Sequence, residues 1–156
     1  MDETLLHAAT LEDIYDNQIY GLDARPTFKT WFIDENLKIE IGVFLRPGCI
    51  EALKQLKEYY QIGVFTASEE VYADAILDKV DPTKTLFNCR LYRSKCTRTS
   101  LNLNPQQLQQ NEQNNKDDYL SQEKVFYIKD LRCIRGFNLS EITLVDNSLL
   151  SFALQP

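Results

Sequence analysis

The hydrophobic and polar positions of the chain change period several times, and each change predicts a new element. Residues 27–33 and 37–45 are rich in β-branched and aromatic residues, and residues 34–36 between them, Asp-Glu-Asn, are a turn signal. In the second segment apolar and polar residues alternate, which is typical of a strand with one buried face. The two segments are therefore predicted to form a β-hairpin.

A helical period replaces this alternation at residue 47. Residues 47–60 place their apolar side chains on one side of a helix of about three turns. A short apolar run follows at 61–65, and Ser68 then stands where it can cap a second helix. That helix is predicted to run to about Val80, because Asp81-Pro82 cannot continue it. Strand, helix, strand and helix in this order predict an α/β fold with crossover connections.

The pattern lapses after residue 100. Residues 101–118 are a low-complexity insertion rich in Asn and Gln, which predicts a solvated loop because such a composition buries little apolar area. Beyond it we expect a strand at 124–128, a short helical stretch around 130–134 and a strand at 142–146. Residues 1–156 together are predicted to form a single domain.

Composition narrows the classes of function. The 156 residues carry 17 basic and 23 acidic side chains, a formal net charge of -6, which argues against direct binding to nucleic acid through a basic face. No apolar run approaches the roughly 20 residues that span a bilayer, so no membrane segment is expected. The four cysteines show no CxxC spacing and there is one histidine, so free thiols are expected rather than a zinc site. Free thiols favour a reducing compartment, either nuclear or cytoplasmic.

Polar side chains stand where the predicted strands end, which is where ligands bind in open α/β sheets. They are Asp2, Thr66, Lys129, Asp146 and Asn147. Taken singly, the threonine could cap a helix, the lysine could extend to solvent and the Asp-Asn pair could form a turn. Together they supply oxygen ligands for magnesium, a hydroxyl and an ammonium for phosphate, and an acid for a leaving group. The set therefore predicts phosphoryl transfer and lacks only a nucleophile.

Seven segments in order resemble the catalytic domain of the carboxy-terminal-domain (CTD) phosphatases. This group includes the small nuclear phosphatases and the dullard-type enzymes of the haloacid dehalogenase (HAD) superfamily. The segments are residues 2–7, 45–48, 64–68, 72–74, 93–96, 127–131 and 144–148. The resemblance implies a HAD-like Rossmannoid parallel sheet with a β-hairpin inserted after the first motif. It also implies Mg²⁺-dependent removal of phosphate from serine or threonine of a phosphoprotein, such as the C-terminal domain of RNA polymerase II, through an aspartyl-phosphate intermediate.

The resemblance also assigns roles residue by residue. The first motif of the family reads Asp-x-Asp-x-Thr, and Asp2 matches its second aspartate, the general acid and base. Thr66 matches the hydroxyl that binds phosphate, and Lys129 matches the lysine that steadies phosphate and nucleophile. Arg93 matches an arginine of the family's Arg-x-x-Cys block and is expected to help bind phosphate. Each of these residues stands in its motif in the printed sequence.

The same resemblance implies a metal set and a missing group. Asp2, Asp146 and Asn147 are the expected magnesium ligands. The nucleophilic aspartate and the strand before it would precede Met1, so the chain as written is expected to be inactive and destabilised. We also expect further structure beyond Pro156, which makes the chain a fragment truncated at both ends. The alternative is a catalytically inactive binding module on the same fold, but the retained phosphate and metal residues favour the phosphatase.

Overall fold

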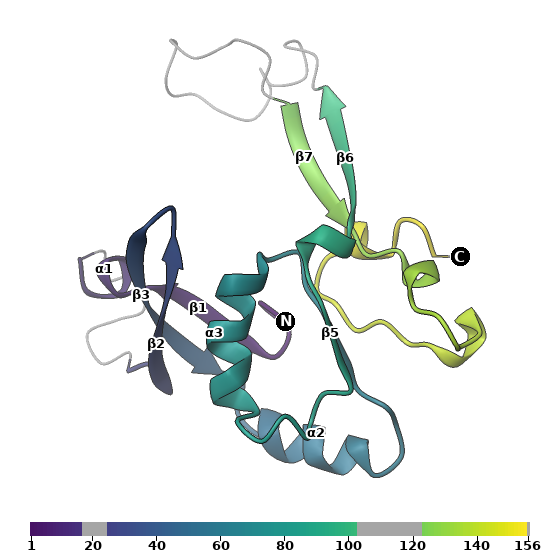
Figure 1. Cartoon of the computed structure of the whole chain (residues 1–156), viewed down its shortest axis with the longest axis horizontal. Helices are drawn as coiled ribbons and strands as arrows, with labels where there is room; N and C mark the ends of the chain where they lie inside the picture. Colours follow the sequence, from purple (N-terminus) through teal and green to yellow (C-terminus); the bar gives the residue numbers. More distant parts are fainter. Residues whose placement is uncertain (17–24, 103–122, 156) are drawn as a thin grey trace.

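The computed structural model describes residues 1–16, 25–102 and 123–155, which form a mixture of helices and strands (Figure 1). The helices and strands are β1 (Leu6–Thr10), α1 (Leu11–Asp16), β2 (Phe28–Asp34), β3 (Leu37–Leu45), α2 (Cys49–Lys57), β4 (Gly63–Phe65), α3 (Glu70–Val80), β5 (Cys89–Leu91), β6 (Thr97–Asn102) and β7 (Glu123–Ile128). Short 3-10 helices lie at Arg93–Lys95, Leu131–Cys133, Leu139–Glu141 and Leu149–Phe152. The predicted insertion at 101–118 falls mostly outside the described residues.

The predicted hairpin is confirmed and gains a third strand. β2 pairs antiparallel with β3, and Asp34 lies opposite Leu37 so that two residues make the turn. These are Glu35 and Asn36, whose φ angles of 44° and 70° are the left-handed pair that closes a tight hairpin. β1 adds to the free edge of β3, giving the order β1-β3-β2. The hydrophobic pattern does not predict β1, because Leu6–Thr10 has no clear alternation of apolar and polar residues.

The α/β crossover is confirmed in one parallel pair. β4 and β5 pair in parallel with α3 between them in the chain, and Val64 lies opposite Arg90. β6 and β7 form a separate antiparallel ribbon in which Thr97 lies opposite Ile128. Figure 1 shows this ribbon projecting from the rest of the described molecule. Thus β7, predicted at 124–128, is present but takes its partner from β6 rather than from the parallel pair.

The predicted strand at 142–146 is wrong as a strand. Burial still alternates along it, with residues 142, 144 and 146 half-buried and 143 and 145 exposed, as expected for an extended segment with one covered face. However, the segment pairs with no strand among the residues that the structure describes. Alternation sets the conformation of a segment, whereas a strand also needs a neighbour for its backbone hydrogen bonds.

The core lies where α3 meets the hairpin sheet, α2 and β4. Ala73, Ile76 and Leu77 of α3 are fully buried, together with Val43 of β3. Burying a large aliphatic side chain stabilises a fold by about 1.5–3 kcal/mol. The buried side chains of α3 therefore contribute strongly to the stability of the core. The helix begins at Glu70 after Glu69, which makes no side-chain capping bond, so the prediction that Ser68 caps it is wrong. Its end at Val80 agrees with the prediction.

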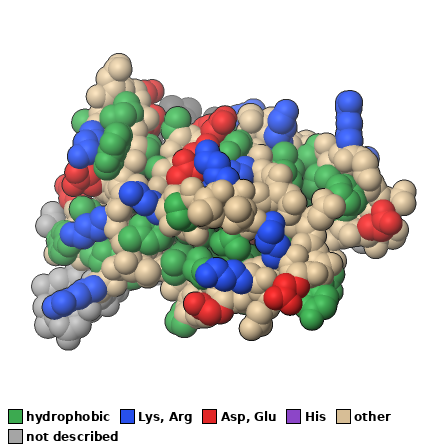
Figure 2. All heavy atoms as spheres, turned by 60° about the horizontal axis from the view of Figure 1, so that its bottom comes forward, with side chains coloured by type: hydrophobic (Ala, Val, Ile, Leu, Met, Phe, Trp, Pro, Cys, Tyr) green, Lys and Arg blue, Asp and Glu red, His purple; other side chains and the backbone are tan. Residues whose placement is uncertain are grey.

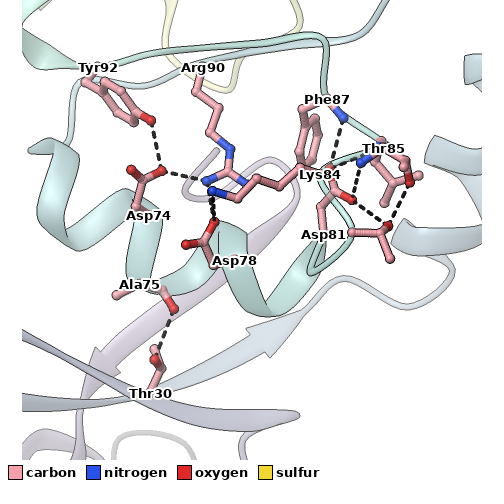
Figure 3. A network of polar contacts seen from close by, with 12 residues as sticks. Thr30, Asp74, Ala75, Asp78, Asp81, Lys84, Thr85, Phe87, Arg90 and Tyr92 are labelled. Atoms are coloured by element: carbon pink, nitrogen blue, oxygen red, sulfur yellow. Dashed lines mark hydrogen bonds and ion pairs between the residues drawn. The ribbon is translucent and has the colours of Figure 1, made fainter.

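A network of charged and hydroxyl groups ties α3 to β5 (Figure 3). Arg90 Nη1 donates to Asp74 Oδ1 and to Asp78 Oδ1, each at 2.7 Å. The Tyr92 hydroxyl donates to Asp74 Oδ1 at 2.8 Å. Burial, followed by this hydrogen bond and the charge of Asp74, raises the pKa of Tyr92 to about 12. These contacts brace the crossover between β4 and β5.

The described surface mixes charges of both signs. On the face shown in Figure 2, Lys and Arg side chains are interspersed with Asp and Glu, and hydrophobic side chains lie between them. All four cysteines are free, as predicted. Within the described ranges, none of the helices has the length and apolar character needed to cross a membrane.

Candidate active site

Thr66 stands at the end of β4, where the backbone turns toward α3. Its side chain is buried, and its N–H donates to Leu91 O of β5 at 2.9 Å. Thr66 Oγ1 accepts a hydrogen bond from the N–H of Ser68 at 3.1 Å. A hydroxyl that accepts such a bond keeps its own proton for donation. The strand end and this local turn together fix the position of the hydroxyl.

Asp2 is held by two hydroxyl groups at the start of α3. The Ser68 hydroxyl donates to Asp2 Oδ2 at 2.9 Å, and the Tyr72 hydroxyl donates to Asp2 Oδ1 at 3.1 Å. Burial, then the charge of Asp2 and this hydrogen bond, raise the pKa of the Tyr72 phenol well above its ordinary value. The phenol therefore stays protonated at neutral pH and acts as a donor. Ser68, which was predicted to cap the helix, instead donates a hydrogen bond to this carboxylate.

Lys129 and Asp146 form a buried ion pair. Their side chains are only 6% and 5% exposed, and Lys129 Nζ donates to Asp146 Oδ2. Asp146 Oδ1 also accepts the N–H of Ser148 at 2.8 Å. Burial alone would raise the pKa of Asp146, but the hydrogen bonds from Lys129, Ser148 and Ser151 outweigh it and leave this pKa lowered. The pair thus presents a fixed ammonium and a fixed carboxylate.

The charged groups act on one common point, the backbone nitrogen of Met1. Burial and the charge of Lys129 lower the pKa of the Met1 amine, whereas the charges of Asp2 and Asp146 oppose this shift. The Met1 side chain is itself buried in the core. The charges of Lys129 and Asp146, far along the sequence, therefore act on the beginning of the chain, next to Asp2.

Arg93 and Asn147 are placed differently from this cluster. Arg93 Nε donates to Ala67 O at 2.6 Å and its Nη1 to Glu69 Oε1 at 2.8 Å, so the guanidinium holds the segment that carries Thr66. The guanidinium also lies 5.0 Å from the centre of the Tyr127 ring. The structure thus engages Arg93 with protein groups beside the site. Asn147 follows Asp146 directly, and its side chain is exposed.

The donor set suits a magnesium ion by its chemistry. The described residues hold no group of three or more His, Cys, Asp and Glu side chains that could bind a metal. The oxygen donors that the sequence predicts for it are an oxygen of Asp2, the carboxylate of Asp146 and the amide oxygen of Asn147. Mg²⁺ is usually bound by one or two carboxylates, with water and substrate phosphate completing its shell. These residues fit that requirement.

Two groups around Asp2 were missed as partners by the sequence reasoning. Ser68 and Tyr72 stand four positions apart at the start of a helix, so their side chains share one face. That spacing was a usable signal, but nothing local indicated that Asp2 would lie against the face. Thr4, of the same motif as Asp2, has a buried hydroxyl with no partner among the described residues.

Comparison with known protein families gives a match over the whole chain. The family model described as NLI interacting factor-like phosphatase matches residues 1–156. The chain belongs to this family. The resemblance inferred from the seven segments is therefore confirmed.

Several curated relatives are similar to this member of the NLI interacting factor-like phosphatases. CTD small phosphatase-like protein 2 of Dictyostelium discoideum is 28% identical over 155 residues, which cover 99% of this chain and 21% of that protein. CTD small phosphatase-like protein 3 of Caenorhabditis elegans is 30% identical, covering 99% and 42%. CTD nuclear envelope phosphatase 1B of Danio rerio is 27% identical, covering 100% and 53%. The chain thus spans between about a fifth and a half of these relatives.

A solved structure supports the fold. A variant of the fission yeast RNA polymerase II CTD phosphatase Fcp1, bound to beryllium fluoride, superposes with a TM-score of 0.50 at 20% sequence identity. The match covers 62% of this chain and 29% of that chain. The expected HAD-like α/β fold, with a hairpin inserted after the first motif, is confirmed by this similarity together with the parallel pair β4 and β5.

Proposed function

We propose that the protein containing this chain is a magnesium-dependent phosphatase that removes phosphate from serine or threonine of phosphoproteins. The observation that carries this proposal is the buried pair of Lys129 with Asp146, together with the link from Asp2 through Ser68 to the Thr66 turn. Membership of a phosphatase family supports the reaction class. The finer assignment depends on which of these groups meets phosphate and which moves a proton.

In the first step an aspartate carboxylate bonded ahead of Met1 attacks phosphorus. The burial of Met1 and the charges of Lys129, Asp2 and Asp146 that act on its nitrogen are consistent with this step. A bond forms between the attacking oxygen and phosphorus while the bond from phosphorus to the serine or threonine oxygen breaks. Asp2 donates its proton to that leaving oxygen, and Lys129 with the Thr66 hydroxyl stabilises the phosphate oxygens.

In the second step water replaces the carboxylate on phosphorus. Asp2, now a carboxylate, takes a proton from the water as the water oxygen bonds to phosphorus. The bond to the attacking carboxylate breaks, which releases inorganic phosphate and regenerates the enzyme. The hydroxyls of Ser68 and Tyr72 support this role, because they hold the Asp2 oxygens without neutralising them.

The magnesium ion would be held by Asp2, Asp146 and Asn147. When bound it would offset the negative charge of the phosphate group. Arg93 is proposed to contribute to phosphate binding from beside the site, which requires its guanidinium to release Glu69. The exposure of that ion pair supports such an exchange.

The substrate and compartment are proposed from the relatives. Two of the relatives described above are CTD small phosphatase-like proteins, and the third is a CTD nuclear envelope phosphatase. We therefore propose a phosphoprotein substrate and a nuclear location, and the C-terminal domain of RNA polymerase II is the first phosphoprotein to test. The formal net charge of -6, and the mixed charge of the face shown in Figure 2, do not favour direct binding to nucleic acid.

The test is Asp2→Asn in the full-length protein that contains this chain. Turnover of a phosphoserine peptide, followed by phosphate release with Mg²⁺ present, is expected to fall by about 10²–10⁴-fold. Asp34→Asn, a change in the exposed hairpin turn, is the matched control and should leave turnover unchanged. Removal of Mg²⁺ by a chelator should abolish turnover in both the parent and the control. A parent protein that binds the phosphopeptide without turnover would overturn the proposal in favour of a binding module.

A further inference from the structure

The Asp2 carboxylate is fixed by donors that come from one short segment. Ser68 stands just before α3 and Tyr72 within its first turn, and each donates to a different carboxylate oxygen. Two donors on two oxygens set both the position of the carboxylate and the orientation of its plane. A group that delivers a proton within hydrogen-bond reach depends on both.

The Tyr72 ring also contacts the inserted hairpin. It meets the Phe32 ring of β2 edge-on, with 5.5 Å between ring centres and an interplanar angle of 86°. One turn further along α3, Thr30 Oγ1 of β2 donates to Ala75 O at 3.0 Å (Figure 3). Of these two contacts between the hairpin and α3, the Phe32 contact involves the residue that touches Asp2.

From these contacts we infer that Ser68 and Tyr72 are positioning residues for Asp2, and that Tyr72 ties the position of this carboxylate to the hairpin through Phe32. The inference rests on the proposed function of Asp2 as the group that protonates the leaving oxygen. The Tyr72 hydroxyl meets Asp2, and its ring packs against Phe32. The Phe32 ring is therefore the contact by which a movement of the hairpin reaches the side-chain donors of Asp2, whereas the backbone of residues 3–5 meets Arg46, at the end of β3, directly.

The test compares two leaving groups, because only one of them needs the acid. A serine alkoxide is a poor leaving group and requires a proton, whereas the phenolate of p-nitrophenyl phosphate leaves without one. The ratio kcat/KM reports the steps up to the first transfer, so it isolates this difference. In the full-length protein, Tyr72→Phe should lower kcat/KM for a phosphoserine peptide about tenfold. The same change should alter kcat/KM for p-nitrophenyl phosphate less than about twofold, because proton delivery is not needed there.

Three further variants separate positioning from stability. Ser68→Ala should show the same selective loss as Tyr72→Phe, since it removes the other donor. Phe32→Leu should show a smaller selective loss, about threefold, because it loosens the Tyr72 ring without removing its hydroxyl. Thr30→Val removes the second hairpin anchor and should leave the ratio of the two kcat/KM values unchanged. Tyr60→Phe, which removes an exposed hydroxyl, is the control for the substitution itself.

The outcomes distinguish this inference from the proposed function. A parent protein inactive on both esters, or one whose turnover of the phosphopeptide survives Asp2→Asn, overturns the proposed function and this inference with it. If Asp2 is required but Tyr72→Phe lowers both esters equally, or neither, the positioning role is wrong. If Thr30→Val changes the ratio as much as Phe32→Leu, the coupling through Tyr72 is wrong. Thermal unfolding of each variant shows whether an equal loss on both esters reflects a reduced folded fraction.

Discussion

The two ends of α3 each hold a buried or half-buried aspartate, and they hold it differently. After the helix, Asp81 is 1% exposed and accepts three backbone N–H groups, those of Thr85, Leu86 and Phe87, all within six positions (Figure 3). Before the helix, Asp2 accepts two side-chain hydroxyls that lie 66 and 70 positions away. Backbone donors fix a loop around a permanent charge, whereas hydroxyls can rotate when a carboxylate gains or loses a proton.

The ion pairs of Arg90 and of Lys129 also differ in how they hold their aspartates. Arg90 shares its charge between Asp74 and Asp78, and the side chains of these carboxylates are 35% and 50% exposed. Lys129 and Asp146 are almost completely buried and pair one to one. A buried pair costs more desolvation, so its presence at a strand end is better explained by a ligand than by stability. We therefore regard the Arg90 network as structural and the Lys129 pair as part of the site.

The largest effect is expected for Lys129→Met. The substitution leaves Asp146 as a buried charge without its partner, which costs about 3–5 kcal/mol of folding free energy. Turnover should fall by at least about 100-fold, because the ammonium that we propose to bind phosphate is lost. Urea unfolding and phosphate release measure the two effects. Lys79→Met, at an exposed position of α3, is the control and should change neither. A folded Lys129→Met protein with parental turnover would contradict the contrast between the two pairs.

Asp81→Asn should give the second-largest effect, on stability alone. The amide has one acceptor oxygen for three backbone donors, so the variant leaves buried N–H groups poorly satisfied. We expect a loss of about 2–3 kcal/mol in urea unfolding. Turnover per folded molecule should be unchanged, which is the opposite of the result expected for Asp2→Asn. Loss of turnover in a folded Asp81→Asn protein would show that the two ends of α3 are not separable.

The contrast also explains how much the sequence predicts. The hairpin, α2 and α3 follow from patterns within about ten residues, and they were predicted close to their bounds. The end of α3 before Asp81-Pro82 also follows from a local signal, because proline disfavours continuation of the helix. Pairing is not local, so β7 found its partner in β6 and the segment 142–146 found none among the described residues. β1 and β6 were missed because short strands with weak alternation depend on a neighbour for their stability.

The site residues also divide into those that local position or a motif predicts and those whose contacts depend on the tertiary fold. Thr66 and Lys129 stand at strand ends and could be proposed from position, and the family motif adds Asp2 and Asp146. Arg93 was expected to meet phosphate, but its guanidinium holds the backbone of Ala67, which no spacing in the sequence could indicate. The contact between Tyr72 and Asp2 joins two residues that lie 70 positions apart, so it depends on how the whole chain folds. Tertiary contacts of this kind are what pattern and propensity leave undetermined.

A pH series sharpens the assignment of Asp81. Burial would raise the pKa of this carboxyl, but the backbone hydrogen bonds and the charge of Arg90 outweigh it and hold the pKa below the ordinary 3.8. The unfolded chain therefore takes up this proton first as pH falls. The stability from Asp81 is complete above about pH 4 and is lost as pH falls through the folded-state pKa.

The measurable consequence is a difference between two unfolding curves. The free energy of unfolding of the parent protein minus that of Asp81→Asn should be constant from pH 7 to about 5 and should shrink below about pH 4. Because only the difference is used, other titrating carboxyls cancel. A difference that grows as pH falls would reverse the sign of the shift and contradict the assigned hydrogen bonds.

The smallest effect is expected for Asp78→Asn. Arg90 Nη1 retains Asp74 at 2.7 Å, and the Asp78 side chain is half exposed, so water screens the lost pair. We expect a loss of at most about 1 kcal/mol in urea unfolding, with turnover unchanged. Asp74→Asn is the matched comparison and should cost more, because Asp74 also accepts the Tyr92 hydroxyl. If Asp78→Asn costs as much as Asp74→Asn, then Arg90 holds α3 through both carboxylates equally, and the network is a single unit rather than one principal contact with an exposed addition.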